Sequence, residues 1–260
     1  MKTIFYSPCI DATNEDMFFE SMEAATELGA DLLVFPENVY TPYNEFLSSV
    51  DILNGDDYED VLSCLYEFCS ELGHAAVFNA TDASGFCYSI FVNPMAHKGE
   101  TFNKLYIKHT KAPLTCFDLE DYDKCIAEIF EPIIYRGRKI ALSIGEDIFL
   151  PNIFAQYAKN GADLVINSFS ADSSFPDIQK ACKEISSWKN QVVLSVGFDG
   201  KCFAASPAKD QLDVTGELRS LNWVLSDNSD YVSAASGDEP CFANTENLIG
   251  KHIDKYLLLK

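Results

Sequence analysis

Short apolar runs alternate with amphipathic segments along the 260-residue chain. Runs rich in β-branched and aromatic residues predict strands, and they cover residues 3–7, 32–36, 75–80, 88–93, 139–144, 163–168, 191–196 and 201–206. Apolar residues at helical spacing predict helices between them, at residues 17–28, 58–73, 153–158 and 175–190. This alternation of helices with mostly buried strands indicates an α/β layered domain.

A unit made of a helix, a glycine and a strand occurs twice. Residues 29–36 read GADLLVFP and residues 161–168 read GADLVINS, and a predicted helix precedes each segment. Gly29 and Gly161 fit the position just past a helix end, where glycine adopts a positive φ at little cost. Two related halves favour two packed sheets with helices outside, and a single doubly wound sheet is the alternative that the same pattern allows.

Composition indicates one large folded domain over residues 1–260. Hydrophobic residues make up 47% of the chain, phenylalanine alone occurs 19 times, and no stretch rich in proline, glycine and serine divides the sequence. This supply of apolar side chains is enough for a sizeable core, which excludes a disordered chain.

The charge balance limits the classes of partner. Nineteen basic residues against forty acidic ones give a formal net charge of −21, which repels phosphate backbones and anionic lipid surfaces. No apolar run reaches the ~18 residues that a membrane-spanning helix needs. We therefore expect neither nucleic acid nor a membrane as a partner.

The cysteines and histidines indicate neither a disulfide framework nor a metal site. Nine cysteines are scattered without C-x-x-C spacing, and the four histidines have no cysteine or histidine partner at ligand spacing. The first residues, MKTIFYSP, lack the apolar centre of a signal peptide. These features predict a cytoplasmic protein without a metal or other cofactor.

Three residues that bear on chemistry lie near the ends of predicted strands. Glu37 follows residues 32–36, where a general base could lie, although this spacing alone also fits a surface acid. Lys104 follows a strand and the turn at Gly99, and an ammonium group there could stabilise negative charge on a reacting carbonyl. Gly145 ends residues 139–144 just before Glu146, a layout typical of a sharp strand-to-helix turn.

Together these segments resemble the nitrilase, or carbon–nitrogen hydrolase, superfamily. GADLLVFPENVYTPY (29–43) resembles its glutamate signature, FNKLYI (102–107) its lysine signature and ALSIGEDIFLPN (141–152) its cysteine signature. SSWKNQVVLSV (186–196) and CFAASPAKDQLDVTGE (202–217) resemble later segments, so the similarity extends over the whole chain.

The resemblance implies a four-layer αββα sandwich that forms a homodimer, and a cysteine thiolate that attacks an amide or nitrile carbon. By the same resemblance Glu37 matches the general base, Lys104 matches the lysine with Lys108 as the alternative register, and the backbone N–H of Glu146 lies in the oxyanion hole. Gly145 stands where the family has its cysteine.

Other positions also depart from the family pattern. The second glutamate expected soon after the lysine is missing, since no acid occurs between Lys104 and Asp118. Leu-Pro-Asn at 150–152 replaces Phe-Pro-Glu. Several changed positions favour natural loss of the nucleophile over a single engineered change.

We therefore expect a catalytically inactive homologue that binds a small amide or carboxylate or serves as a partner subunit. The alternative is an amidase or glutaminase-type hydrolase of small linear amides whose cysteine has been replaced at position 145. A third hypothesis is a displaced nucleophile, Ser143 or Cys116. Ser143 is ~6–7 Å from Gly145 along a strand, too far to attack the same carbon.

Overall fold

A computed structural model describes residues 3–5, 18–19, 22, 25–27, 30–39, 44–51, 55–108, 130–189, 191–198, 201–205, 220–224, 231–235 and 243–246. Gly29, Cys116 and Asp118, which entered the sequence predictions, lie outside these described residues.

The first sheet comes from the N-terminal half of the chain. Within the described residues it has five strands in spatial order: β1 (Thr3–Phe5), β2 (Leu32–Val34), β3 (Ala75–Thr81), β4 (Cys87–Val92) and β5 (Asn103–Ile107). The β1–β2 and β2–β3 pairs are parallel, whereas β3–β4 and β4–β5 are antiparallel. The carboxyl end of β2 and the end of β5 are the parts of this sheet that lead into the candidate site.

The second sheet is built in the same way from the C-terminal half. Its described strands lie in the order β10 (Phe203–Ala205), β9 (Val192–Val196), β8 (Leu164–Ser168), β7 (Arg138–Ile144) and β6 (Ile133–Tyr135). The central strands β7, β8 and β9 are parallel, and the two outer pairs are antiparallel. A further antiparallel sheet joins β11 (Ser220–Val224), β12 (Tyr231–Ala235) and β13 (Ala243–Glu246).

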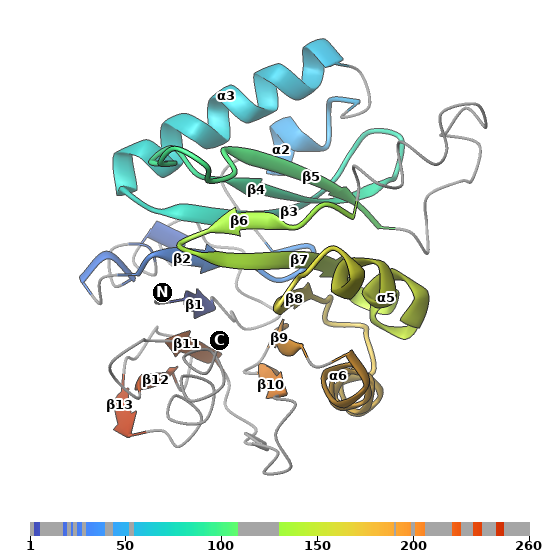
Figure 1. Cartoon of the computed structure of the whole chain (residues 1–260). Coiled ribbons are helices and arrows are strands. Elements are labelled where there is room, and N and C mark those ends of the chain that lie inside the picture. Colours follow the sequence, from blue (N-terminus) through green and yellow to red (C-terminus); the bar gives the residue numbers. More distant parts are fainter. Residues whose placement is uncertain are drawn as a thin grey trace, which may run out of the picture.

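Helices cover the outer faces of the two main sheets. Figure 1 shows α3 (Gly55–Leu72) above the first sheet, and α5 (Pro151–Lys159) and α6 (Phe175–Lys189) beside the second. The short helix α2 (Asn44–Leu47) lies near α3. The fold is therefore the expected four-layer αββα sandwich.

Strand alternation divides the apolar side chains between two clusters. Leu33 and Phe78 pack with the helix α3, whereas Leu32 and Phe91 belong to the cluster that also holds Leu142 of the second sheet. Both faces of the central strands are thus covered by protein, which is why these strands read as continuous apolar runs rather than as an alternating pattern.

The helix–glycine–strand prediction is confirmed in the second half of the chain. After α5 ends at Lys159, Gly161 has φ +84° and its N–H bonds to the carbonyl of Ala158. The next N–H, that of Ala162, bonds to Tyr157, which completes the hydrogen-bond pattern of a Schellman motif. The chain then passes directly into β8.

Two features of the fold differ from the sequence prediction. Lys104, which was expected after a strand, lies inside β5, where it pairs with Phe91 of β4. The sequence pattern also did not predict β5, β6 or the three strands β11–β13. In β5 and β13 polar residues interrupt the apolar pattern.

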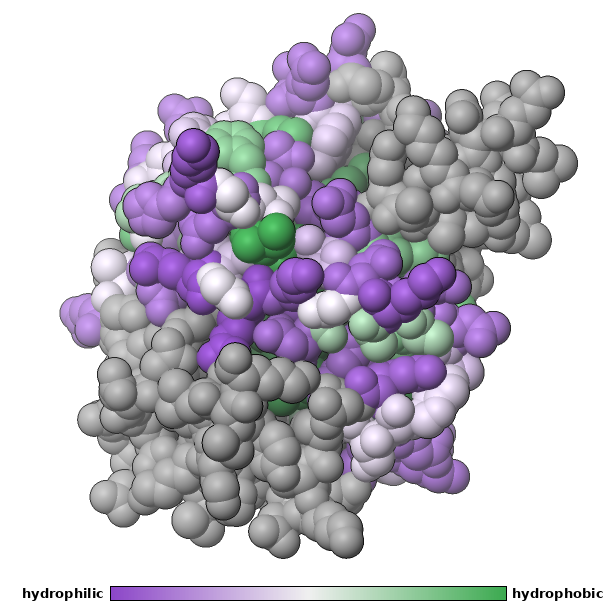
Figure 2. Space-filling model, viewed as in Figure 1, coloured by the Kyte–Doolittle hydropathy of each residue, from purple (hydrophilic) through white to green (hydrophobic). Residues whose placement is uncertain are grey.

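On the face seen in Figure 2, hydrophilic residues predominate and the apolar areas are small and separate. No helix among the described residues is long and apolar enough to cross a membrane.

Candidate functional site

The backbone that leads into Glu37 is held in place by two hydrogen bonds to the carbonyl of Phe35. Phe35 follows β2, and its carbonyl oxygen accepts from Asn79 Nδ2 at 2.6 Å and from Ser168 Oγ at 2.9 Å. Ser168 ends β8 of the second sheet, so this carbonyl joins the two sheets. Asn38, which follows, has a positive φ of 60°, and Glu37 itself is 2% exposed.

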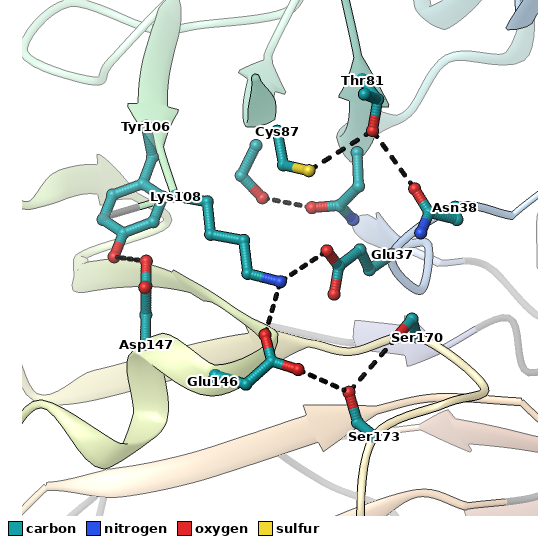
Figure 3. A network of polar contacts seen from close by, with 12 residues as sticks. Glu37, Asn38, Thr81, Cys87, Tyr106, Lys108, Glu146, Asp147, Ser170 and Ser173 are labelled. Atoms are coloured by element: carbon teal, nitrogen blue, oxygen red, sulfur yellow. Dashed lines mark hydrogen bonds and ion pairs between the residues drawn. The ribbon is translucent and has the colours of Figure 1, made fainter. Parts of the chain in front are cut away.

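Lys108 reaches Glu37 from the end of β5. Its backbone N–H donates to the carbonyl of Cys87 at 2.8 Å, so the residue continues the β4–β5 ladder by one position. Its Nζ lies 2.7 Å from Glu37 Oε1, and the Lys108 side chain is 2% exposed. Figure 3 shows the ammonium group between two carboxylates, those of Glu37 and Glu146.

Gly145 lies next to the Glu37–Lys108 ion pair. β7 ends at Ile144, and Gly145 turns the chain with φ +51° into a short 3-10 helix, Gly145–Phe149, which precedes α5. A Cβ atom built on Gly145 would lie 2.7 Å from both Glu37 Oε2 and Lys108 Nζ. The side-chain direction at position 145 therefore points at the two charged groups.

Glu146 provides a second carboxylate for Lys108. Its Oε2 lies 2.6 Å from Lys108 Nζ, and its Oε1 accepts a hydrogen bond of 3.3 Å from Ser173 Oγ. Ser173 belongs to the loop between β8 and α6, where its hydroxyl also contacts that of Ser170 at 3.2 Å. The side chain of Glu146 is 48% exposed, so it lies between the buried ion pair and solvent.

A buried contact ties β5 to the turn at Gly145. Tyr106 Oη donates to Asp147 Oδ2 at 2.8 Å, and both residues are almost fully buried. Tyr106 precedes Lys108 by two positions and Asp147 follows Gly145 by two, so one hydrogen bond fixes the strand end against the turn. Burial, reinforced by the charge of Asp147, raises the pKa of Tyr106 well above its usual value and keeps the phenol protonated.

The charges of the site stabilise one another. Burial acts to lower the pKa of Lys108, but its hydrogen bonds and charge interactions with Glu146 and Glu37 outweigh burial and raise it. Partial burial likewise acts to raise the pKa of Glu146, but the contact with Lys108 outweighs it and holds the pKa below the usual range. Lys108 and Glu146 are therefore both charged at neutral pH.

The structure brings together three of the four predicted site residues. Glu37, Gly145 and Glu146 meet, and the ammonium group that joins them belongs to Lys108 rather than to Lys104. Lys104 points to the same face of β5 but lies four residues earlier, ~13 Å along the strand. The ammonium group beside Gly145 is thus that of Lys108, which the sequence resemblance gave as the alternative register.

Sequence reasoning missed the carboxylate of Glu146 and the hydroxyl of Ser173. The sequence prediction for Glu146 concerned only its backbone N–H, which lies in the first turn of the 3-10 helix and donates a hydrogen bond to the residue's own carboxylate. Local sequence gives no signal for these contacts, because Lys108 and Ser173 lie in segments far from Glu146 in the chain.

Ser143 lies on the face of the second sheet away from Glu37. It pairs in register with Asn167, which donates to Ser195 Oγ at 3.0 Å on the same face. Ser195 in turn interacts with Cys182 of α6. The opposite face carries Ser168, which bonds to the segment before Glu37. Ser143 is therefore excluded as a displaced nucleophile.

The site contains two carboxylates, those of Glu37 and Glu146, together with a lysine and a backbone turn. Among the described residues, no group of three histidine, cysteine or acidic side chains is arranged to hold a metal ion. Glu37 is placed to accept a proton and Lys108 to donate hydrogen bonds to a carbonyl oxygen or oxyanion at Gly145.

Solved structures of amidases share the fold. A variant of an amidase from Nesterenkonia AN1, of the nitrilase superfamily, aligns with a TM-score of 0.60 and 16% identity over 86% of this chain and 90% of that chain. The amidase itself from Nesterenkonia sp. aligns with a TM-score of 0.59 and 18% identity over 87% and 90% of the two chains. A carbon–nitrogen hydrolase from Helicobacter pylori G27 aligns at 0.56 and 14%, over 86% and 88%.

The chain has the fold of these nitrilase-superfamily amidases. Identities of 14–18% show the fold alone. No protein-family model matches the sequence, and neither does any curated protein.

Proposed function

We propose that this protein is a non-catalytic homologue of the carbon–nitrogen hydrolases that binds a small amide through the Glu37–Lys108 pair. The observation that carries the proposal is the position of Gly145. Its side-chain direction points at Glu37 Oε2 and Lys108 Nζ, each 2.7 Å from the Cβ position, yet glycine brings no nucleophile to them.

Acyl transfer through a covalent intermediate needs a nucleophile within reach of its base. In one of the amidase structures that share the fold, acrylamide has added to an active-site cysteine. In this chain a nucleophile for acyl transfer would have to stand at Gly145, between the base Glu37 and the ammonium group of Lys108. Without a thiol the pair can bind and polarise a carbonyl group, but it forms no acyl-enzyme.

The surroundings favour a small ligand that accepts hydrogen bonds. Glu37 and Lys108 are each only 2% exposed, and Glu146 lies on the solvent side of the pair. A carbonyl oxygen could accept from Lys108 Nζ, and an amide N–H could donate to Glu37. An amide offers both groups on one small, uncharged molecule.

The test combines binding with turnover. Calorimetric titration with acetamide and butyramide should show binding to the unaltered protein and loss of binding in Glu37→Gln and Lys108→Met. Ammonia release from the same amides should stay at the background rate. Turnover that disappears in Glu37→Gln would overturn the non-catalytic assignment, and turnover that persists in that variant would point to a contaminating enzyme.

A second candidate is an amidase whose cysteine was replaced at position 145. The observation that favours it is the intact acid–lysine pair, which closes at 2.7 Å over the turn. Sequencing codon 145 in the source gene decides between the two candidates, since a cysteine codon would support this one and a glycine codon the non-catalytic homologue.

A further inference from the structure

The carboxylate of Glu146 is held at both oxygens by groups from two other segments. Lys108 Nζ, at the end of β5, binds Oε2 at 2.6 Å, and Ser173 Oγ, in the loop before α6, donates to Oε1 at 3.3 Å. Figure 3 shows both contacts on the Glu146 side chain, which is 48% exposed. An ammonium group and a hydroxyl that grip the two oxygens of one carboxylate form a recognition site for that group.

Neutralisation of Lys108 does not require Glu146. Lys108 is 2% exposed and already has the buried carboxylate of Glu37 at 2.7 Å, so that pair is neutral by itself. Glu146 adds a second negative charge, and its side chain is 48% exposed. A long side chain at this depth can rotate into solvent and remain hydrated there, while Lys108 keeps its partner Glu37.

We infer that Glu146 is a built-in occupant of the ligand site, and that a small free monocarboxylate binds to Lys108 and Ser173 when Glu146 swings outward. The inference rests on the proposed function, because it takes the Glu37–Lys108 pair to hold a small ligand. The exchange replaces one carboxylate with another at the same donors. It therefore leaves the hydrogen bonds of Lys108 and Ser173 satisfied.

The tether makes Glu146 a strong competitor. A group attached to the protein through a short linker acts at an effective concentration in the millimolar range. If Glu146 occupies the donors for about 90–99% of the time, the apparent affinity for a free carboxylate falls about 10- to 100-fold. Removal of the Glu146 side chain should therefore raise the apparent affinity for a free carboxylate by the same factor.

The experiment is calorimetric titration with sodium butyrate at fixed ionic strength. Glu146→Ala should bind butyrate about 10- to 100-fold more tightly than the unaltered protein does. Glu146→Gln keeps the length and one acceptor oxygen but loses the charge, so its affinity should lie between the two. Asp172→Ala is the matched control, because it removes an exposed acid next to Ser173 and should leave the affinity unchanged.

Butyramide separates failure of this inference from failure of the proposed function. If butyramide binds the unaltered protein but butyrate binds Glu146→Ala and Glu146→Gln no better than it binds the unaltered protein, the inference is wrong and the proposed function stands. If neither compound binds any variant that gives a native circular dichroism spectrum, the proposed function fails as well. An equal gain of butyrate affinity in Asp172→Ala would mean that the effect comes from net charge. It would contradict the inference that Glu146 occupies the ligand site.

Discussion

Lys108 Nζ lies 2.7 Å from Glu37 Oε1, and the two residues are 71 positions apart in the chain. Lys108 directly follows β5, and Glu37 lies in the loop after β2. Both residues are almost fully buried. The contact closes over Gly145, so the two charged groups and the turn form one unit.

Substitution of Lys108 should lower the free energy of unfolding more than substitution of Lys104. Lys108→Met leaves Glu37 as a buried charge without this partner, so the free energy of unfolding should fall by about 3–5 kcal/mol. Lys104 is only partly buried, so Lys104→Met should cost less than about 1 kcal/mol. Urea denaturation at neutral pH measures both values, and equal losses would contradict the assignment of the site lysine to Lys108.

Gly145→Ala should destabilise the protein more than Gly137→Ala does. Both glycines have positive φ, +51° and +75°, so both substitutions bring backbone strain of roughly 1–2 kcal/mol. A Cβ on Gly137 meets no atom within 4 Å, whereas a Cβ on Gly145 lies 2.7 Å from two charged atoms that must move. That displacement should add ~1–3 kcal/mol. Thermal and urea denaturation measure the stability of the two variants. Equal losses of stability would show that Glu37 and Lys108 can move aside at no cost, which would contradict the prediction.

Gly145→Cys should not restore efficient hydrolysis. The new side chain would enter space that Glu37 and Lys108 now occupy, and Glu146 competes for the same ammonium group. If Lys108 stays bound to Glu146, it is not available to stabilise the oxyanion, and loss of one such oriented group typically lowers a rate by ~10²–10³. We expect slow covalent labelling by an electrophilic amide analogue, seen by mass spectrometry, and at most weak ammonia release. Robust multiple turnover would mean that the remainder of the site is intact and would favour the replaced-cysteine amidase.

Stability should fall in mild acid because of His74. This residue is 6% exposed, and its Nε2 lies 2.9 Å from Thr26 Oγ1. Burial lowers the pKa of His74 below 6.5, against smaller opposing effects of the Ala30 carbonyl and the Asp31 charge. Below pH 6.5 the unfolded chain therefore binds more protons at this residue than the folded chain, so the free energy of unfolding decreases as the pH falls towards the folded-state pKa.

Urea denaturation between about pH 7.5 and 5.5 tests this dependence. His74→Gln should flatten the decrease over that range, even if it lowers stability at every pH. His97→Gln changes an exposed histidine and serves as the comparison variant. An unchanged slope in His74→Gln would show that other groups cause the decrease.

We also predict a homodimer, on the basis of the family resemblance in the sequence. Light scattering at micromolar concentration should give twice the mass of one chain. The described residues include large apolar side chains that are exposed in the single chain, among them Phe149 at 45% and Trp188 at 60%. A monomer at that concentration would contradict the prediction.

Much of the fold could be read from local patterns in the chain. The runs at residues 75–80, 139–144 and 163–168 became β3, β7 and β8 because strands covered on both faces need continuous apolar sequence. Gly161 could be placed after a helix because the αL conformation there favours glycine. The acid after residues 32–36 and the glycine after residues 139–144 were likewise visible, since strand ends are marked by local sequence.

The partners of those residues could not be read in this way. Lys104 and Lys108 share one face of the same strand, and nothing in a period of two distinguishes them. The choice depends on how far β5 runs before it meets the turn at Gly145, which the packing of one sheet on the other sets. The second contact of Lys108, with Glu146, likewise requires the 3-10 turn to direct that side chain back across the sheets. Local sequence determines where a strand ends, whereas the distance between two strand ends is a property of the packed layers.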